Sequence, residues 1–385
     1  MFASEKNNPS FTSIQLVHSG EDYFSRLERI INEAVIEIHI QTYIFSNDAT
    51  GKRILFAIKG ALNRQVKVYL LLDGFGSLYF PNEISNELRQ AGGHIRFFSP
   101  LFSASSFYIG RRLHKKVVVA DSKVALIGGI NIANRYHGNS DEKPWLDFAI
   151  EINSSIVKSI QSHCKANYYK KKSALRETIP PIFEAEEKVL IQILQNDWLN
   201  RKSEISEAYI QSISNAKEKV IIVGSYFLPG RKLTHALLEA SKNKVKIQLI
   251  LSGVSDLPMT RRASCYLYSK LLKHNIELYE WNQSVLHGKA MVVDGSWTTI
   301  GSFNLNNLSS YASIEMNVGI ESAAFATFFE EELQQILLQC QKITPESFQT
   351  RNTIISKITT ALSYYITRGI EIIVTYLPYK RFNHS

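Results

Sequence analysis

The stretch RRLHKKVVVADSKVALIGGIN, residues 111–131, places a histidine and a lysine two positions apart at the start of an apolar run. Side chains two positions apart on a strand point to the same face of its sheet, so His114 and Lys116 are predicted to lie together. Such a pair is either part of the rim of a core or half of an active site. The rest of the chain decides between these two interpretations.

A hairpin turn brings a third polar residue to this pair. Asp121 and Ser122 are residue types that favour tight turns. If the two strands fold back about a point between Ser122 and Lys123, Asn131 lies opposite His114, and directly paired residues share a face of the sheet. The hairpin therefore predicts one cluster of histidine, lysine and asparagine.

The same pattern recurs in the second half of the chain. LHGKAMVVDGSWTTIGSFN, residues 286–304, matches residues 113–131, and residues 230–253 match residues 51–74 without a gap. Repeats of this kind indicate that one structural unit occurs twice. The chain is therefore predicted to consist of two copies of one domain.

The second hairpin carries the same three polar residue types. His287 and Lys289 precede a turn at Asp294-Gly295, and Asn304 falls opposite His287. A single strand histidine is usually a residue of the core or its rim. Here the three polar residues occur twice with identical spacing, on strands that otherwise bury apolar side chains. Burying these polar groups costs free energy, which is unexpected unless they have a function. The duplicated cluster therefore favours an active site.

The strands outside the hairpins predict an α/β fold. VKVYLLLD, residues 66–73, and VKIQLILS, residues 245–252, are too apolar for a sheet with one face in water, and they alternate with amphipathic helices. This pattern is typical of a mostly parallel sheet buried between two layers of helices.

Four segments follow from the repeat. Residues 1–167 and 189–345 are expected to be the two domains, joined by a charged linker at 168–188 that contains Pro180-Pro181. Residues 346–385 have no counterpart in the first copy and are expected to be an appendage.

Composition limits the partners and the compartment. The 385 residues include 44 Lys and Arg against 35 Asp and Glu, a formal charge of +9 that favours nucleic acid, an acidic membrane surface or a phosphorylated substrate. Cys164, Cys265 and Cys340 are too far apart in the sequence to indicate a disulfide framework or a thiolate metal cage. The N-terminus does not resemble a signal peptide, and no run of 18 uncharged apolar residues occurs, so the protein is expected to lie on a membrane rather than span it.

Longer motifs around both hairpins resemble a known family. His114-x-Lys116-x4-Asp121 and His287-x-Lys289-x4-Asp294 resemble the paired HxKxxxxD signatures of the phospholipase D superfamily. The stretches GGINIANRYHG with PWLD, and GSFNLNNLSS with EMN, are similar to bacterial cardiolipin synthases. The resemblance covers about residues 10–345 and is to the short form, without the two N-terminal transmembrane helices of longer members.

This resemblance implies a fold and an activity. The fold would be two tandem α/β/α sandwich domains that form a pseudo-twofold dimer with one active site at their interface. The activity would be a phosphatidyltransferase that makes cardiolipin from phosphatidylglycerol through a phosphohistidine, with a second phosphatidylglycerol or phosphatidylethanolamine as acceptor. The resemblance assigns the nucleophile to His114, acid and base catalysis to His287, and the orientation of the two imidazoles to Asp147 and Glu315.

The residues themselves suit such chemistry. Lys116, Lys289 and the two asparagines can hold the non-bridging oxygens of a phosphodiester and spread the charge of the transition state. Because two lysines supply this charge, no metal or cofactor is expected. Asp121 and Asp294 sit at the hairpin turns and are interpreted as structural members of the motif.

Three other functions remain open. The same chemistry would serve a lipid hydrolase or a nuclease of the superfamily, and a non-catalytic membrane-binding protein could keep the fold. The intact motifs argue against the last of these. A lipid substrate predicts peripheral attachment to the cytoplasmic side of a bacterial inner membrane, with no nucleic-acid partner.

Two segments are candidates for membrane contact. Phe102, Phe107 and Tyr108 precede Arg111-Arg112, and are either buried aromatics of a surface loop or a lip that meets acyl chains and lipid phosphates. Arg261-Arg262 in the second copy has the same two interpretations. The apolar, tyrosine-rich tail from residue 353 is predicted to lie in the membrane interface, with packing onto the protein as the alternative.

Overall fold

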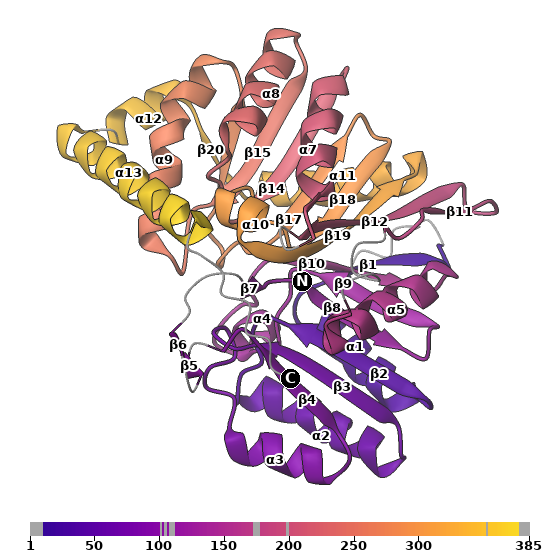
Figure 1. Ribbon diagram of the computed structural model, residues 1–385. Coiled ribbons are helices and arrows are strands. Elements are labelled where there is room, and N and C mark those ends of the chain that lie inside the picture. Colours follow the sequence, from indigo (N-terminus) through magenta and orange to yellow (C-terminus); the bar gives the residue numbers. More distant parts are fainter. Residues whose placement is uncertain are drawn as a thin grey trace.

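The chain folds into two halves with the same order of elements, shown in a computed structural model (Figure 1). The structure describes residues 11–100, 102–103, 106–107, 112–171, 178–197, 200–351 and 353–376. Strands of the first half are β1 (Ile14–His18), β2 (Glu37–Thr42), β3 (Lys67–Asp73), β4 (His94–Phe98), β5 (Phe102–Ser103), β6 (Ser106–Phe107), β7 (Arg112–Leu113), β8 (Lys116–Ala120), β9 (Val124–Gly128) and β10 (Phe148–Ile152). Its helices are α1 (Glu21–Glu33), α2 (Ala49–Asn63), α3 (Asn82–Gln90), α4 (Asn134–His137) and α5 (Ile156–Tyr169).

The second half repeats this order and adds a C-terminal extension. Its strands are β11 (Ile182–Glu184), β12 (Val189–Asp197), β13 (Lys202–Ser203), β14 (Lys219–Gly224), β15 (Lys246–Ser252), β16 (Glu277–Trp281), β17 (Lys289–Val293), β18 (Trp297–Gly301), β19 (Ser313–Glu321) and β20 (Gln341–Ile343). Its helices are α7 (Glu204–Asn215), α8 (Arg231–Lys242), α9 (Pro258–Lys273), α10 (Asn307–Tyr311), α11 (Ala323–Leu338), α12 (Pro345–Arg351) and α13 (Ile354–Tyr376).

The strand order of the two sheets confirms the repeat. The first sheet runs β1-β10-β9-β8-β2-β3-β4, and the second contains the corresponding path β12-β19-β18-β17-β14-β15-β16. β11 extends the second sheet beside β12, so part of the predicted linker belongs to that sheet. The α/β fold with two tandem domains predicted from the repeat is the fold of this chain.

The expectation of mostly parallel sheets is wrong. Among the main strands of the described residues, β2, β3 and β4 run parallel in the first sheet and β14, β15 and β16 in the second, while the others pair antiparallel. The antiparallel strands are also apolar on both faces because both faces of each sheet are covered. An apolar run therefore indicated burial here, and not strand direction.

The hairpin register differs by one residue from the prediction. Ala120 pairs with Val124, so three residues and not two close the first turn, and Asp121 and Ser122 both have positive φ. The second hairpin closes in the same way, with Val293 opposite Trp297. This longer turn puts Gly128 opposite Lys116, so a continued ladder would set Ile130, and not Asn131, against His114.

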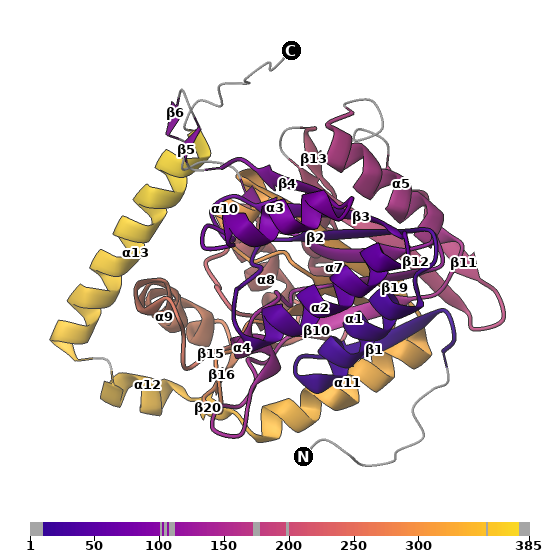
Figure 2. The same cartoon turned by 90° about the horizontal axis from the view of Figure 1, so that it is seen from below.

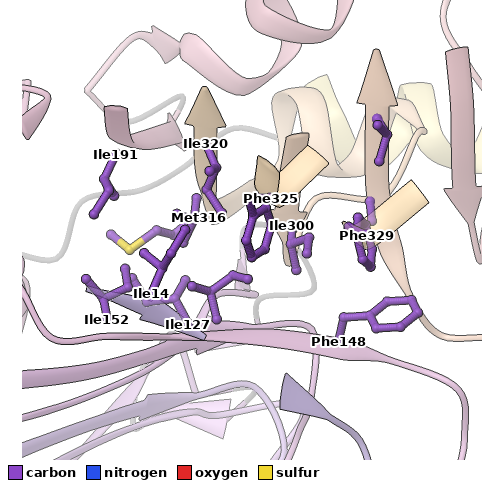
Figure 3. Packing of buried hydrophobic residues seen from close by; sticks show 14 of the residues in the cluster. Ile14, Ile127, Phe148, Ile152, Ile191, Ile300, Met316, Ile320, Phe325 and Phe329 are labelled. Atoms are coloured by element: carbon purple, nitrogen blue, oxygen red, sulfur yellow. The ribbon is translucent and has the colours of Figure 1, made fainter. Parts of the chain in front are cut away.

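Three large apolar cores and one small cluster of Leu71, Leu113 and Ile314 pack the described residues together. One lies between the first sheet and α1 and α2, and one between the second sheet and α7, α8 and α9. The third is shared, because α5, α11 and the inner faces of both sheets meet in it. Figure 3 shows residues of this shared core from both halves: Ile14, Ile127, Phe148 and Ile152 from the first, and Ile191, Ile300, Met316, Ile320, Phe325 and Phe329 from the second.

Two short backbone pairings cross from one half to the other. Leu113 in β7 pairs parallel with Ile314 in β19, and Leu146 forms a parallel bridge with Leu286. The two contacts are reciprocal. In each of them, the residue before the histidine of one half pairs with the residue before a buried carboxylate of the other half. Reciprocal contacts of this kind are what a twofold relation between two similar units produces.

The C-terminal helix α13 packs against α9 along one side of the second half (Figure 2). Its buried face is polar, with Ser363, Thr367 and Glu371 each less than one tenth exposed. Its outer face is apolar and exposed, with Ile358 62%, Leu362 59% and Ile373 63% accessible. Within the described residues, no helix has both the length and the apolar character needed to cross a bilayer.

Candidate active site

The candidate site lies where the two halves meet, and each histidine is held by the other half. The backbone amide of His114 donates to the carbonyl of Ile314, at 3.0 Å. The next residue along β19 is Glu315, whose Oε2 lies 2.9 Å from Nδ1 of His114. The second half therefore fixes both the backbone and the ring of the first-half histidine.

The second histidine shows the same arrangement in reverse. The amide of His287 donates to the carbonyl of Leu146, at 2.8 Å, and its Nδ1 lies 2.6 Å from Oδ2 of Asp147. The sequence predicted both carboxylates but did not show which histidine each of them faces. The structure pairs them across the interface, His114 with Glu315 and His287 with Asp147.

Small residues beside each carboxylate make these pairs possible. A Cβ atom on Gly129 would lie 2.4 Å from Oδ1 of Asp147, so only glycine fits there without displacing the carboxylate. Ser302 takes the corresponding place in the second half, and its hydroxyl donates to Oε2 of Glu315, at 2.5 Å. The Gly-Gly and Gly-Ser pairs quoted in the motifs therefore have a packing role.

The two lysines are buried at the same centre. Nζ of Lys116 donates to the carbonyl of His114, and Nζ of Lys289 donates to the carbonyl of His287. Burial lowers the pKa of Lys116 to about 7, partly offset by the charge of Glu315. Burial also lowers the pKa of Lys289 to about 8. The two lysine side chains lie close to each other with little water around them. A site of this kind favours the binding of an anion, because the anion stabilises their charged forms.

Burial also sets the protonation of the histidines and of Asp147. It lowers the pKa of His114, an effect that the charge of Glu315 partly offsets. It lowers the pKa of His287 well below its ordinary value, and the positive charges of Lys289 and Lys116 act in the same direction. Burial raises the pKa of Asp147 to about 7. With a carboxylate at each Nδ1, a neutral imidazole carries its proton there and keeps a lone pair on Nε2.

Asn131 is linked to the histidine of the other half. Its Nδ2 donates to the hydroxyl of Tyr136, at 2.7 Å, and that hydroxyl lies 3.3 Å from Nε2 of His287. Asn304 accepts a hydrogen bond from the hydroxyl of Ser225, at 2.9 Å. The hairpin prediction placed each asparagine beside the histidine of its own hairpin. Asn131 is instead linked through Tyr136 to the histidine of the other hairpin.

Aromatic rings surround both histidines, and sequence reasoning missed them. The ring centres of Tyr43 and His114 lie 5.1 Å apart, and those of Tyr226 and His287 lie 6.1 Å apart. Trp145 packs on His287 as well, at 5.8 Å. A signal was present for the two tyrosines, because TYIF and SYFL occupy equivalent places after equivalent strands of the repeat.

Asp73 is a further residue of the site that the motifs did not show. It is fully buried at the end of β3, and its Oδ2 accepts from the amide of Leu113, at 2.8 Å. Its Oδ1 lies 3.7 Å from the guanidinium of Arg112. Burial raises the pKa of Asp73 to about 6. Asp73 thus ties the segment before His114 to the first sheet.

The motif aspartates lie at the opposite ends of the hairpins and hold the turns to the sheets. Asp121 accepts from the backbone amides of residues 35–37 at 2.8–2.9 Å, and Asp294 accepts from those of residues 217–219 at 2.8–2.9 Å. Their partners are distant in sequence and not the local turn amides that the sequence suggested. Both contacts join a hairpin to the segment that precedes β2 or β14.

In the part of the chain that the structure describes, no three His, Cys, Asp or Glu side chains gather as a metal site would require. Arg112 of the proposed lip is mostly buried. Arg111 and Tyr108, and the side chains of Phe102 and Phe107, lie outside the described residues.

A site with two oriented imidazoles and two lysines suits phosphodiester chemistry, and comparison with known proteins agrees with it. The sequence matches the family described as "Cardiolipin synthase, PLD-like domain" over residues 27–164 and 209–337, which include both hairpins. The chain belongs to this family. It is a cardiolipin synthase-type phosphatidyltransferase of the phospholipase D superfamily.

Similar proteins align with this chain over most of its length. Cardiolipin synthase B of Escherichia coli (strain K12) is 31% identical over 374 residues, which cover 95% of this chain and 90% of that protein. The minor cardiolipin synthase ClsB of Bacillus subtilis (strain 168) is 27% identical over 345 residues, which cover 88% of this chain and 85% of that protein. The crystal structure of phosphatidylserine synthase from Haemophilus influenzae Rd KW20 has the same fold, with a TM-score of 0.73, 15% identity and 96% coverage of both chains.

Proposed function

We propose that this phosphatidyltransferase takes a phosphatidyl group from phosphatidylglycerol and gives it to the terminal hydroxyl of a second phosphatidylglycerol, through a covalent phosphohistidine. Of the two expected acceptors, phosphatidylethanolamine carries an amine and not a hydroxyl at this place, so transfer to it would not give cardiolipin. The observation that carries the proposal is the crossed pairing of His114 with Glu315 and His287 with Asp147. Neither half holds an oriented histidine without the other. One reaction centre that uses both imidazoles follows from this arrangement.

The first step breaks the phosphodiester of the donor. Nε2 of His114 attacks phosphorus, the bond from phosphorus to the glycerol oxygen breaks, and His287 gives a proton to that oxygen. His287 therefore enters this step as an imidazolium with a proton on Nε2 as well as on Nδ1, a form that the negative charge of the bound phosphodiester favours. In the second step His287 removes a proton from the acceptor hydroxyl, whose oxygen attacks phosphorus as the bond to His114 breaks. The enzyme returns to its starting state, with glycerol and cardiolipin as the products from phosphatidylglycerol.

The surroundings of the two imidazoles support this division of roles. Nε2 of His114 has no hydrogen-bond partner among the described residues, so its lone pair is available for attack. Nε2 of His287 lies 3.3 Å from the hydroxyl of Tyr136, as a group that exchanges protons would. Lys116 and Lys289 supply the positive charge for the non-bridging oxygens, and the anion in turn favours their protonated forms.

We further propose that α13 attaches the protein to the membrane surface. The helix is inverted relative to an ordinary surface helix, since Ser363, Thr367 and Glu371 face the protein while isoleucines face outward. Glu371 is satisfied there by Arg368, whose Nη1 donates at 2.9 Å. An exposed apolar helix face of this kind suits the interface of a bilayer.

Product analysis tests the proposal. The purified protein is incubated with phosphatidylglycerol vesicles, with and without phosphatidylethanolamine, in the presence of EDTA. We expect cardiolipin and free glycerol in equal amounts, with activity that survives chelation. Phosphatidic acid as the main product would favour a hydrolase, and activity that returns only with added Mg²⁺ or Zn²⁺ would refute the metal-free mechanism.

A further inference from the structure

The two sides of the site differ in a way that the repeat does not predict. Tyr226 corresponds to Tyr43, but its hydroxyl donates to Oδ1 of Asp256, at 2.7 Å. Asp256 is exposed in the segment between β15 and α9. The acidic residue near Tyr43 is Asp73, which is fully buried and bonded to backbone amides. Among the residues that the structure describes, this kind of solvent-facing carboxylate therefore lies on the His287 side.

An exposed cation lies on the same side. The guanidinium of Arg135 stacks 4.8 Å from the centre of the Trp145 ring, and that ring lies 5.8 Å from His287. Arg135 is exposed and has no carboxylate partner among the described residues. A guanidinium held over an aromatic ring is positioned in advance to bind a phosphate group.

The charges of both residues reach the reaction centre. Burial lowers the pKa of Lys289, and the negative charges of Asp147, Glu315 and Asp256 oppose that shift. The pKa of His287 is lowered chiefly by burial, and Arg135 is among the positive groups that lower it further. Arg135 and Asp256 thus lie near the imidazole to which the proposed mechanism assigns proton transfer with the alcohol.

We propose that Arg135 and Asp256 form the subsite for the glycerol headgroup of the acceptor lipid. The inference rests on the proposed function. A phosphatidylglycerol acceptor presents a terminal hydroxyl, a middle hydroxyl and a phosphodiester. The terminal hydroxyl faces His287, the middle hydroxyl donates to Asp256, and the phosphodiester binds Arg135.

The subsite makes different demands on the two half-reactions. The glycerol that leaves the donor has hydroxyls for Asp256 but no phosphate for Arg135, whereas the incoming lipid has both. Asp256 therefore serves departure and arrival of the headgroup, and Arg135 serves the arrival of a lipid acceptor. This difference selects an anionic hydroxyl-bearing phospholipid over water or free glycerol.

Labelled glycerol separates the two roles. Phosphatidylglycerol vesicles are incubated with labelled glycerol, and its exchange into phosphatidylglycerol is measured beside cardiolipin formation. We expect Arg135→Gln to lower cardiolipin formation about tenfold more than glycerol exchange, with partial recovery in Arg135→Lys. We expect Asp256→Asn to raise the glycerol concentration for half-maximal exchange about tenfold and to lower cardiolipin formation as well.

Glu83→Gln, an exposed carboxylate on the corresponding helix α3 of the first half, is the matched control and should change neither rate. An equal loss of both reactions in Arg135→Gln, or no loss, would overturn the role of Arg135. An unchanged glycerol requirement in Asp256→Asn would overturn that of Asp256. Failure of the unaltered enzyme to form cardiolipin or exchange glycerol would instead contradict the proposed function.

Discussion

Single residues at this site depend on burial for their protonation. Lys116 and Lys289 have pKa values of about 7 and about 8 because water is excluded around them. Above these values the free enzyme loses the positive charge that attracts a phosphodiester. When the anion is bound, it favours the charged lysines and raises their pKa.

The dependence of kcat/KM on pH should show this effect. We expect kcat/KM to fall as pH rises through about 7 to 8, since this constant reports on the free enzyme. The corresponding fall in kcat should occur at higher pH, because the bound anion restores the lysine charge. Initial rates on mixed micelles over pH 5.5–10 measure both, and a flat kcat/KM up to the ordinary lysine pKa would contradict the argument.

Gly129 gives a second prediction for a single residue. Its replacement by alanine puts a Cβ atom 2.4 Å from Oδ1 of Asp147, so the carboxylate must move away from His287. We expect Gly129→Ala to lower kcat at least tenfold. Gly60→Ala in α2 is the control, because its Cβ would meet Arg64 at an ordinary 3.6 Å. That control should keep full activity and gain stability by about 1 kcal/mol, and equal rates in both variants would refute the packing role.

Among the elements, the hairpins were largely predictable from local spacing. Turn residues and the two-residue period placed His114, Lys116 and their counterparts on common faces. The register was wrong by one because the turn length depends on the backbone of Asp121 and Ser122, both at positive φ, and not on their identity alone. The partners of Asp121 were not predictable, since contacts with residues 35–37 depend on how the hairpin packs beside β2.

The turn aspartates should affect stability more than catalysis. Asp121→Asn weakens three hydrogen bonds to backbone amides, two of them exposed and one partly buried, and we expect a loss of about 1 kcal/mol in the free energy of unfolding. The rate per folded molecule should stay within about twofold of the original. Urea unfolding measured beside initial rates tests this, and a large loss of kcat with unchanged stability would place Asp121 in the catalytic centre instead.

The C-terminal helix combines the two interpretations that the sequence left open. Its polar face packs against α9 and α10, so deleting it would also damage the second half. Substitutions on the outer face avoid this difficulty. We expect the double variant Ile358→Ser and Leu362→Ser to bind anionic vesicles more weakly, because each substitution removes about 2 kcal/mol from the free energy of membrane partition. The melting temperature should stay unchanged.

Phe56→Ser on α2 is the matched control for these changes, because Phe56 is 79% exposed on the first half. Vesicle flotation of both proteins measures the effect. Unchanged flotation of the α13 variant, or an equal loss in the control, would show that α13 is not the attachment site.

At the scale of the whole molecule, the repeat predicted two domains and the family resemblance implied one site between them, while the crossed contacts required the structure. Glu315 lies far along the chain from His114, and no local spacing could show that it faces His114. The reason is physical, since the shared core of both sheets, α5 and α11 decides which strand end meets which histidine. Tyr43 and Tyr226 could have been predicted from the sequence, because they occupy equivalent places after the equivalent strands β2 and β14.

The central claim is that both halves build one site, and the rates of three variants test it most directly. Cardiolipin formation is measured for His114→Ala, His287→Ala and the double variant, with folding checked by thermal melts. We predict that each single variant loses about three orders of magnitude or more and that the double variant is little worse, because residues that act as a unit are not additive. If either single variant kept more than about a tenth of the activity, or if the losses multiplied in the double variant, the two histidines would not share one reaction centre.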